Sequence, residues 1–174
     1  MGPALGRGSP FYRSMSSEIL DIQTKNATAA ERQRGVENAV VRLLKERPFY
    51  GHFLLGCRRR LAAGTHAVGV TVAHGSPVLC IDPERFARLD GPSQQGLLEH
   101  GLKHLLHLHP VRGKGRHRLT WEVASDLAIN PTIQHLPGTA LQPGRFGLAA
   151  GLAAEEYARA LAARFNTGTL SGEG

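Results

Sequence analysis

The chain has 174 residues, of which 41% are hydrophobic and 20% are charged; this balance is typical of one globular domain and excludes a disordered chain. No apolar run approaches the roughly 20 residues that a membrane-spanning helix needs, so no membrane association is expected. The net charge of +7 would suit an acidic partner, but no stacking aromatic residues are interleaved with the basic ones and no known nucleic-acid-binding motif occurs, so a nucleic-acid-associated role is the least favoured hypothesis.

The two ends of the chain are weakly patterned. Residues 1–26 are rich in glycine and serine and lack the apolar segment of a secretory signal, which predicts a flexible N-terminal extension. The folded domain is predicted over residues 27–166, and residues 167–174 are predicted to be a disordered tail. Cys57 and Cys80 form no CxxC pair and lie in different predicted elements, so no disulfide framework is expected, and a cytoplasmic location is predicted.

The first half of the chain is predicted to form helices followed by a β-hairpin. Apolar residues recur at helical spacing, which predicts helices over residues 27–46 and 49–62. Residues 67–73 and 77–81 are short and rich in β-branched side chains, and the residues between them suit a tight hairpin turn. Asp82 is the predicted N-cap of a short helix that starts with a proline.

The second half of the chain is predicted to be helical, with connections rich in proline and glycine. The longest helix is predicted over residues 93–108 and ends before Pro110, because the residue that precedes a proline avoids the helical conformation. A second helix is predicted over residues 121–130, with Thr120 as its N-cap. A third, amphipathic helix is predicted over residues 152–165. Together with the hairpin, these helices predict an α+β fold.

The longest helix carries a cluster of histidines. His100 and His104 are four residues apart, so both imidazoles lie on one face, where they can bind one metal ion. His107 is seven residues from His100 and lies near the same face. His109 would point to the opposite side if the helix continued, but a break at Pro110 would let it turn back. An isolated pair of this kind is more often part of the polar face of an amphipathic helix.

Two further observations favour a metal site. The helix is strongly apolar, so its histidines lie near a core where polar groups need partners; the apolar positions are Leu97, Leu98, Leu102, Leu105 and Leu106. The next helix offers Glu122 and Asp126, four residues apart on one face. Two imidazoles and one carboxylate form a zinc site of the catalytic type. The alternative without a metal is that Asp126 forms a helix cap or an ion pair with Arg112 or Arg116.

Four motifs follow one another along the chain: VLCIDPERFARL, LLEHGLKHLLHLHPVR, WEVASDLAIN and LPGTALQPGRFGLAAGLAAEEYARAL. In this order they resemble the metallopeptidase domain, within the zincin group, that often precedes a von Willebrand A-like domain in bacterial proteins. The resemblance covers about residues 30–165 and implies a zincin-like α+β fold, a zinc ion and peptide-bond hydrolysis by a metal-bound water. The usual second domain is absent from the sequence, so a protein partner is expected to be supplied in trans.

The chain departs from this family at Gly101. The family's HExxH motif has a glutamate here, which polarises the metal-bound water and moves its proton. Glycine can do neither, so the chain is either an impaired peptidase, a peptidase that uses Glu122 or His107 as its base, or a non-catalytic metal-binding interaction module. A Gly101→Glu substitution is expected to project toward the metal's open position. It is also expected to stabilise the helix, because glycine costs about 1 kcal/mol relative to alanine.

The third metal ligand is open between three residues. The resemblance favours Asp126, which occupies the aspartate position of the third motif. The pair of Glu122 and Asp126 also looks like the Glu-x-x-x-Asp of thermolysin-like zincins, in which the glutamate binds the metal and the aspartate orients a histidine ligand. His109 is the third alternative. The substrate is not indicated beyond a peptide or protein.

Overall fold

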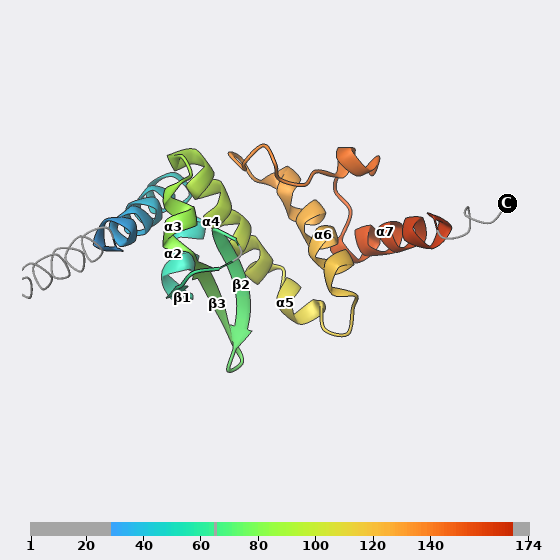
Figure 1. Ribbon diagram of the computed structural model, residues 1–174, viewed down its shortest axis with the longest axis horizontal. Coiled ribbons are helices and arrows are strands. Elements are labelled where there is room, and N and C mark those ends of the chain that lie inside the picture. Colours follow the sequence, from blue (N-terminus) through green and yellow to red (C-terminus); the bar gives the residue numbers. More distant parts are fainter. Residues whose placement is uncertain (1–28, 65, 169–174) are drawn as a thin grey trace, which may run out of the picture.

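The computed structural model describes residues 29–64 and 66–168, and there several helices accompany a small three-stranded sheet whose β-hairpin projects from one side of the molecule (Figure 1). The predicted α+β class is confirmed, and the arrangement is consistent with a zincin-like fold. The predicted N-terminal extension 1–26 lies outside the described residues, as do residues 169–174 of the predicted tail. None of the helices in the described part has the length and apolar content required to cross a bilayer.

The described part of the chain begins with a helix over residues 29–46, which is followed by α2 (Pro48–Gly56) and β1 (Arg58–Leu61). The predicted helix 49–62 is therefore wrong beyond Gly56. Cys57 takes an extended conformation, and β1 then pairs in parallel with β3, from Arg58 opposite Val78 onward. Helix propensity is a weak local preference, and pairing with a strand distant in sequence outweighs it here.

The predicted hairpin is confirmed. Strand β2 (Val68–Ala73) pairs antiparallel with β3 (Ser76–Ile81), which lies in the middle of the sheet in the order β1-β3-β2. His74 and Gly75 connect the two strands and both have positive φ, at 51° and 75°. Two such residues match the right-handed twist of the flanking strands.

The short helix α3 (Pro83–Ala87) begins as predicted. The Asp82 carboxylate accepts hydrogen bonds from the backbone N–H groups of Glu84 and Arg85, at 3.0 and 3.1 Å. It also accepts one from the N–H of Gly64. The Gly64 bond, followed by the others, lowers the pKa of Asp82 below its usual value, because all of these donors favour the charged form.

Helix α4 (Gly91–Leu106) packs against the sheet and carries the histidine cluster. Leu98 and Leu102 are fully buried with the sheet residues Leu79 and Ile81 in one hydrophobic core. The Asp90 carboxylate caps the N-terminus of α4, so the helix starts before the predicted residue 93.

The end of α4 differs from the prediction. The helix stops at Leu106, and Leu108 adopts a left-handed conformation with φ 56°. Pro110 does not act as the terminator. It lies in the first turn of a new short helix, α5 (His109–Arg112), where its missing N–H and fixed φ are tolerated.

Helix α6 (Arg118–Ile129) carries Asp126. Its N-cap is His117, whose Nδ1 accepts from the Thr120 N–H at 3.4 Å, so the prediction of Thr120 as the cap is wrong. His117 acts here as an acceptor in the way that a serine or aspartate usually does.

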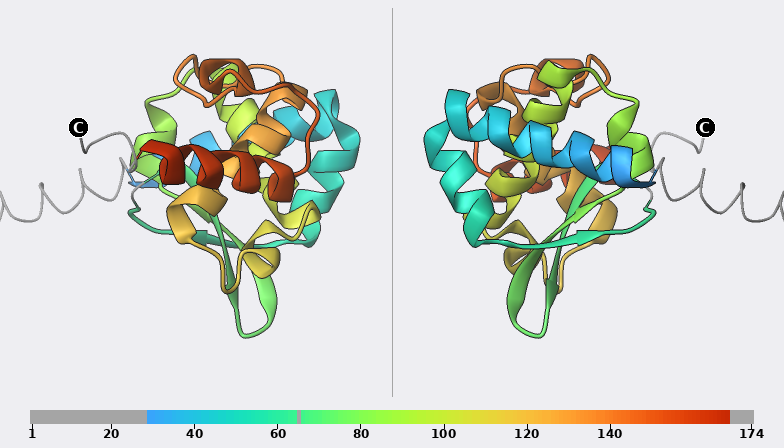
Figure 2. Two further views of the ribbon diagram at one scale, coloured as in Figure 1. Left: turned by 90° about the vertical axis from the view of Figure 1, so that its right-hand side faces the viewer. Right: turned by 90° about the vertical axis from the view of Figure 1, so that its left-hand side faces the viewer.

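The C-terminal elements build a second core. Short 3-10 helices η1 (Asn130–Thr132) and η2 (Pro143–Phe146) lead to α7 (Ala154–Gly168), which runs past the predicted end at residue 165. Tyr157 and Leu161 of α7 pack on α6. Figure 2 shows that α7 (red) and the helix of residues 29–46 (blue) lie at opposite ends of the molecule. Helix α4 contacts both the sheet and α6, so it joins the two cores.

Candidate metal site

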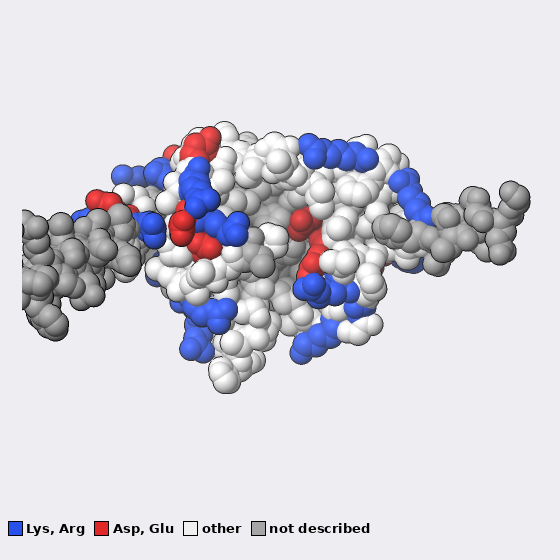
Figure 3. All heavy atoms as spheres, viewed as in Figure 1, with Lys and Arg blue, Asp and Glu red and all other residues white. Residues whose placement is uncertain are grey.

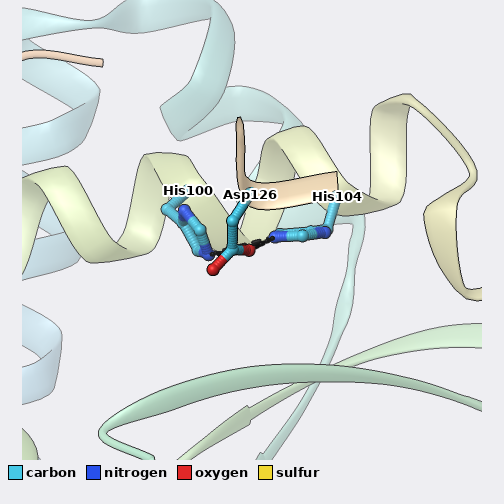
Figure 4. A group of neighbouring side chains, drawn as sticks. All are labelled: His100, His104 and Asp126. Atoms are coloured by element: carbon cyan, nitrogen blue, oxygen red, sulfur yellow. Dashed lines mark hydrogen bonds and ion pairs between the residues drawn. The ribbon is translucent and has the colours of Figure 1, made fainter. Parts of the chain in front are cut away.

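Three predicted side chains meet where α4 faces α6 (Figure 4). His100 and His104 lie one turn apart on α4, and their Nε2 atoms are 3.0 Å apart. Asp126 projects from α6, and its Oδ1 lies 3.1 Å from Nε2 of His104 and 3.6 Å from Nε2 of His100. Within the described residues, these three form a group of ligand atoms close enough to hold one ion. The structure therefore brings together residues that the sequence separates by up to 26 positions.

The donor set fits zinc. Ligand atoms at the usual distances from a tetrahedral zinc ion lie about 3.4 Å from one another, and the three measured separations bracket this value. The side chains of His100, His104 and Asp126 are 18%, 13% and 31% exposed, so the group is recessed but open to solvent. The space-filling view, drawn from the same side as Figure 1, shows a hollow near the middle of the molecule with acidic side chains at its wall (Figure 3).

The protonation state of His100 also suits a ligand. Burial, assisted by the nearby His104, lowers the pKa of His100 to about 4, although Asp126 opposes this shift. His100 is therefore neutral at pH 7. A neutral imidazole offers a lone pair to a metal without first having to lose a proton.

Asn130 fixes which nitrogen of His100 carries the proton. Its Nδ2 donates to the Leu141 carbonyl at 2.8 Å, so its Oδ1 must be the atom that faces His100. Nδ1 of His100 lies 2.9 Å from this oxygen and therefore donates to it. The lone pair of His100 is then left on Nε2, the atom that faces His104 and Asp126. Asn130 was not among the predicted site residues, although its spacing of four residues from Asp126 places both on one face of the helix.

A buried ion pair fixes the backbone around Asn130 to α4. The Lys103 ammonium donates to the Thr132 carbonyl at 2.9 Å and to the Thr132 hydroxyl at 2.6 Å. It also lies 3.1 Å from the carboxylate of Glu99, which pairs with Arg47 at the same distance. Lys103 and Glu99 are only 7% and 2% exposed, so each charge has the partner that its burial requires. The segment that orients His100 is thus held to the helix that carries His100.

The other predicted site residues lie outside the three-residue group. His109 is buried, and its Nδ1 lies 3.0 Å from Nδ1 of His104, on the side of the ring away from Asp126. Burial, with the neighbouring His104 next in effect, lowers the pKa of His109 to about 3. His107 is exposed at the C-cap of α4. The side chain of Glu122 is 56% exposed and pairs with Arg118 at 3.6 Å.

The predicted alternative of an ion pair between Asp126 and an arginine is not formed. Arg112 makes two hydrogen bonds to the carboxylate of Glu155, and Arg116 also lies within 3.9 Å of that carboxylate. This pairing, followed by the other contacts, lowers the pKa of Glu155. Arg112 and Arg116 thus pair with Glu155, whereas Oδ1 of Asp126 faces the two histidines.

Gly101 lies on the side of α4 that packs against the sheet. A Cβ atom at this position would lie 2.7 Å from Cδ1 of Leu79 and 3.0 Å from Cγ1 of Val68. Both distances are shorter than ordinary van der Waals contact. A glutamate side chain at position 101 would therefore start against apolar side chains of the sheet, and this contact opposes the expected gain in helix stability. The expectation that the glutamate points toward the metal's open position stays a prediction.

The sequence was compared with known proteins. It matches a family model described as "Putative metallopeptidase domain" over residues 31–174. No curated protein matches it, and no solved structure does. The matched region contains every element of the site.

Proposed function

We propose that this chain, which belongs to the putative metallopeptidase domain family, binds one zinc ion through His100, His104 and Asp126. The observation that carries the proposal is the convergence of two imidazole nitrogens and one carboxylate oxygen within 3.0–3.6 Å of one another. Metallopeptidase-like function follows from the family. Zinc, the residues that bind it and the state of catalysis are the parts proposed here.

Zinc would supply a Lewis acid at this site, of the kind that polarises a peptide carbonyl. The chain itself would bind the ion, keep His100 neutral and fix the ring of His100 through Asn130. Within the described residues, Asp126 is the one carboxylate in this group of ligand atoms, and as a metal ligand it would not be available as a proton acceptor. A positioned proton acceptor typically contributes about 10²–10⁴-fold to such reactions, so we propose that peptide-bond hydrolysis is impaired.

A second candidate function is a non-catalytic metal-binding module that interacts with a protein partner supplied in trans. The observation that favours it is the packing of Gly101. The position at which the family carries its glutamate faces Leu79 and Val68, so the glycine belongs to the contact between helix and sheet. A protein with such a contact has no need of a catalytic side chain at that position.

The purified protein is expected to contain about one equivalent of zinc, because its ligand atoms already converge. Elemental analysis of protein that was never exposed to a nickel column measures this directly. Dialysis against a chelator, followed by titration with zinc, should remove and restore the metal. A protein that contains no zinc and takes up none on titration would contradict the proposed site.

The zinc-loaded protein is expected to show little or no cleavage of denatured protein substrates, because no general base lies among the three donors. Cleavage should be followed with and without a chelator, beside a zinc peptidase as positive control. Strong chelator-sensitive cleavage would show that another residue serves as the base. His107 and Glu122 would then be substituted by alanine to identify it.

A further inference from the structure

The Nδ1 atom of His104, on the side of the ring away from Asp126, faces a third histidine, His109. Nδ1 of His104 lies 3.0 Å from Nδ1 of His109, and the two rings meet edge to face with centroids 5.0 Å apart. We propose that His109 is a positioning residue for the zinc site: it accepts the Nδ1 proton of His104 and so directs the Nε2 lone pair of His104 to the metal. This inference rests on the proposed zinc site and adds a residue that acts on the site without touching the ion.

The hydrogen-bonding roles follow from the geometry. Nε2 of His104 faces His100 and Asp126, so it is the atom that would bind the metal with its lone pair. A neutral imidazole then carries its proton on Nδ1 and needs an acceptor there. Nδ1 of His109 is the acceptor within reach, and His109 in turn carries its proton on Nε2.

The backbone adopts an unfavourable conformation that delivers His109 to this place. Leu108, between α4 and α5, has φ 56° and ψ 28°, a left-handed conformation that residues other than glycine and asparagine rarely adopt. Without this turn, a continuing α4 would carry residue 109 to the other side of the helix. Such conformations persist only where the surrounding structure determines them, and they are concentrated at functional sites.

Trp121 holds the backbone of His109 from the opposite side. Its indole Nε1 donates to the His109 carbonyl at 2.9 Å, and the two rings contact each other edge to face. Gly113 makes this approach possible, since a Cβ there would lie 2.4 Å from the indole ring. Helix α5 is thus fixed against α6, the same helix that supplies Asp126. His109 is only 3% exposed, so its ring is held on all sides.

The two proposed histidine ligands therefore have separate orienting partners. His100 donates to Asn130, which follows α6, and His104 donates to His109, which opens α5. Outer partners of this kind typically change metal affinity by about 10–100-fold when they are removed. Since His109 lies behind His104, its loss should act on affinity through the orientation of that ring.

The test compares His109→Leu with His109→Asn. Leucine fills the buried space without an acceptor, whereas asparagine keeps a hydrogen-bonding atom near the position of Nδ1. Zinc affinity, measured by competition with a chelating indicator, is expected to fall about 10–100-fold in the leucine variant and to recover largely in the asparagine variant. The matched control is His52→Leu, the same substitution at an exposed histidine of α2, which should leave affinity unchanged.

Long-range ¹H–¹⁵N NMR of the zinc-loaded wild type provides a second readout that does not depend on how the variants fold. We expect a protonated Nδ1 on His104 and a protonated Nε2 with an unprotonated, metal-free Nδ1 on His109. A protonated or zinc-bound Nδ1 on His109, or equal zinc affinities of wild type and His109→Leu, would overturn this inference alone. Absence of zinc binding by the wild type would overturn the proposed function and this inference together.

Discussion

An Asp126→Ala substitution is expected to lower zinc affinity more than any other single substitution on α6. The carboxylate is one of three donors, and its Oδ1 lies within 3.1 and 3.6 Å of the two imidazole nitrogens. Its removal leaves two neutral ligands and no negative charge to compensate the ion. The loss of affinity should therefore be larger than the decrease of about 10–100-fold that is expected when an orienting residue outside the ligand set is removed. Competition titration with zinc indicators would measure it.

Glu122→Ala is the matched control, because it removes a carboxylate one turn earlier on the same helix. Glu122 is exposed and pairs with Arg118, so its loss should leave zinc affinity almost unchanged. The zinc affinity of a His109→Ala variant should lie between the affinities of these two variants. If Glu122→Ala stripped the metal while Asp126→Ala only weakened binding, the thermolysin-like arrangement would be correct and the ligand set proposed here would be wrong.

A Gly101→Glu variant is expected to be destabilised, although glutamate is the better helix former. The new Cβ would overlap Leu79 and Val68, and overpacking of a well-packed core typically costs about 1–3 kcal/mol. The gain in helix propensity is about 1 kcal/mol at most. The carboxylate adds a further cost if it stays among the apolar side chains that surround the new Cβ, because a buried charge needs a partner. Thermal or denaturant unfolding of the metal-free proteins would measure the difference.

A Gly101→Ala variant separates the two contributions, since alanine adds the Cβ without the carboxylate. It should also be less stable than the wild type, by a smaller amount. An alanine variant more stable than the wild type would show that the helix and sheet adapt freely, and the close approach at Gly101 would then not be a constraint. Chelator-sensitive peptidase activity gained by Gly101→Glu would likewise show that the glutamate leaves the apolar contact and reaches the metal side.

Local signals in the sequence predicted most of the fold. The hairpin followed from β-branched runs around a turn that contains Gly75, and α3 from the Asp82 cap, because both patterns specify the backbone within a few residues. Strand β1 was missed because its residues, Arg58–Leu61, show neither alternation nor a turn signal. That strand exists through its parallel pairing with β3, a contact that no local pattern encodes.

The candidate site, like the fold, was predicted from the sequence only where local patterns determine it. Helical spacing placed His100 and His104 on one face, and the family resemblance selected Asp126 from the next helix. The direction of His109 depended on the left-handed turn at Leu108, which a leucine does not signal. The orientation of Gly101 depended on which side of α4 packs against the sheet, and a helix that is apolar around much of its circumference leaves that side undetermined.

The division of the fold into two cores gives the proposed ion a mechanical role. One core contains the sheet and the α4 side that carries Leu98 and Leu102, and the other lies between α6 and α7. The histidines lie on α4, which packs on the sheet, and Asp126 lies on α6, so a bound ion would add a further link between the two cores. Its binding free energy would add to the stability of the folded state. Zinc binding would then make the contact between α4 and α6 more rigid, whether or not the site cleaves a peptide.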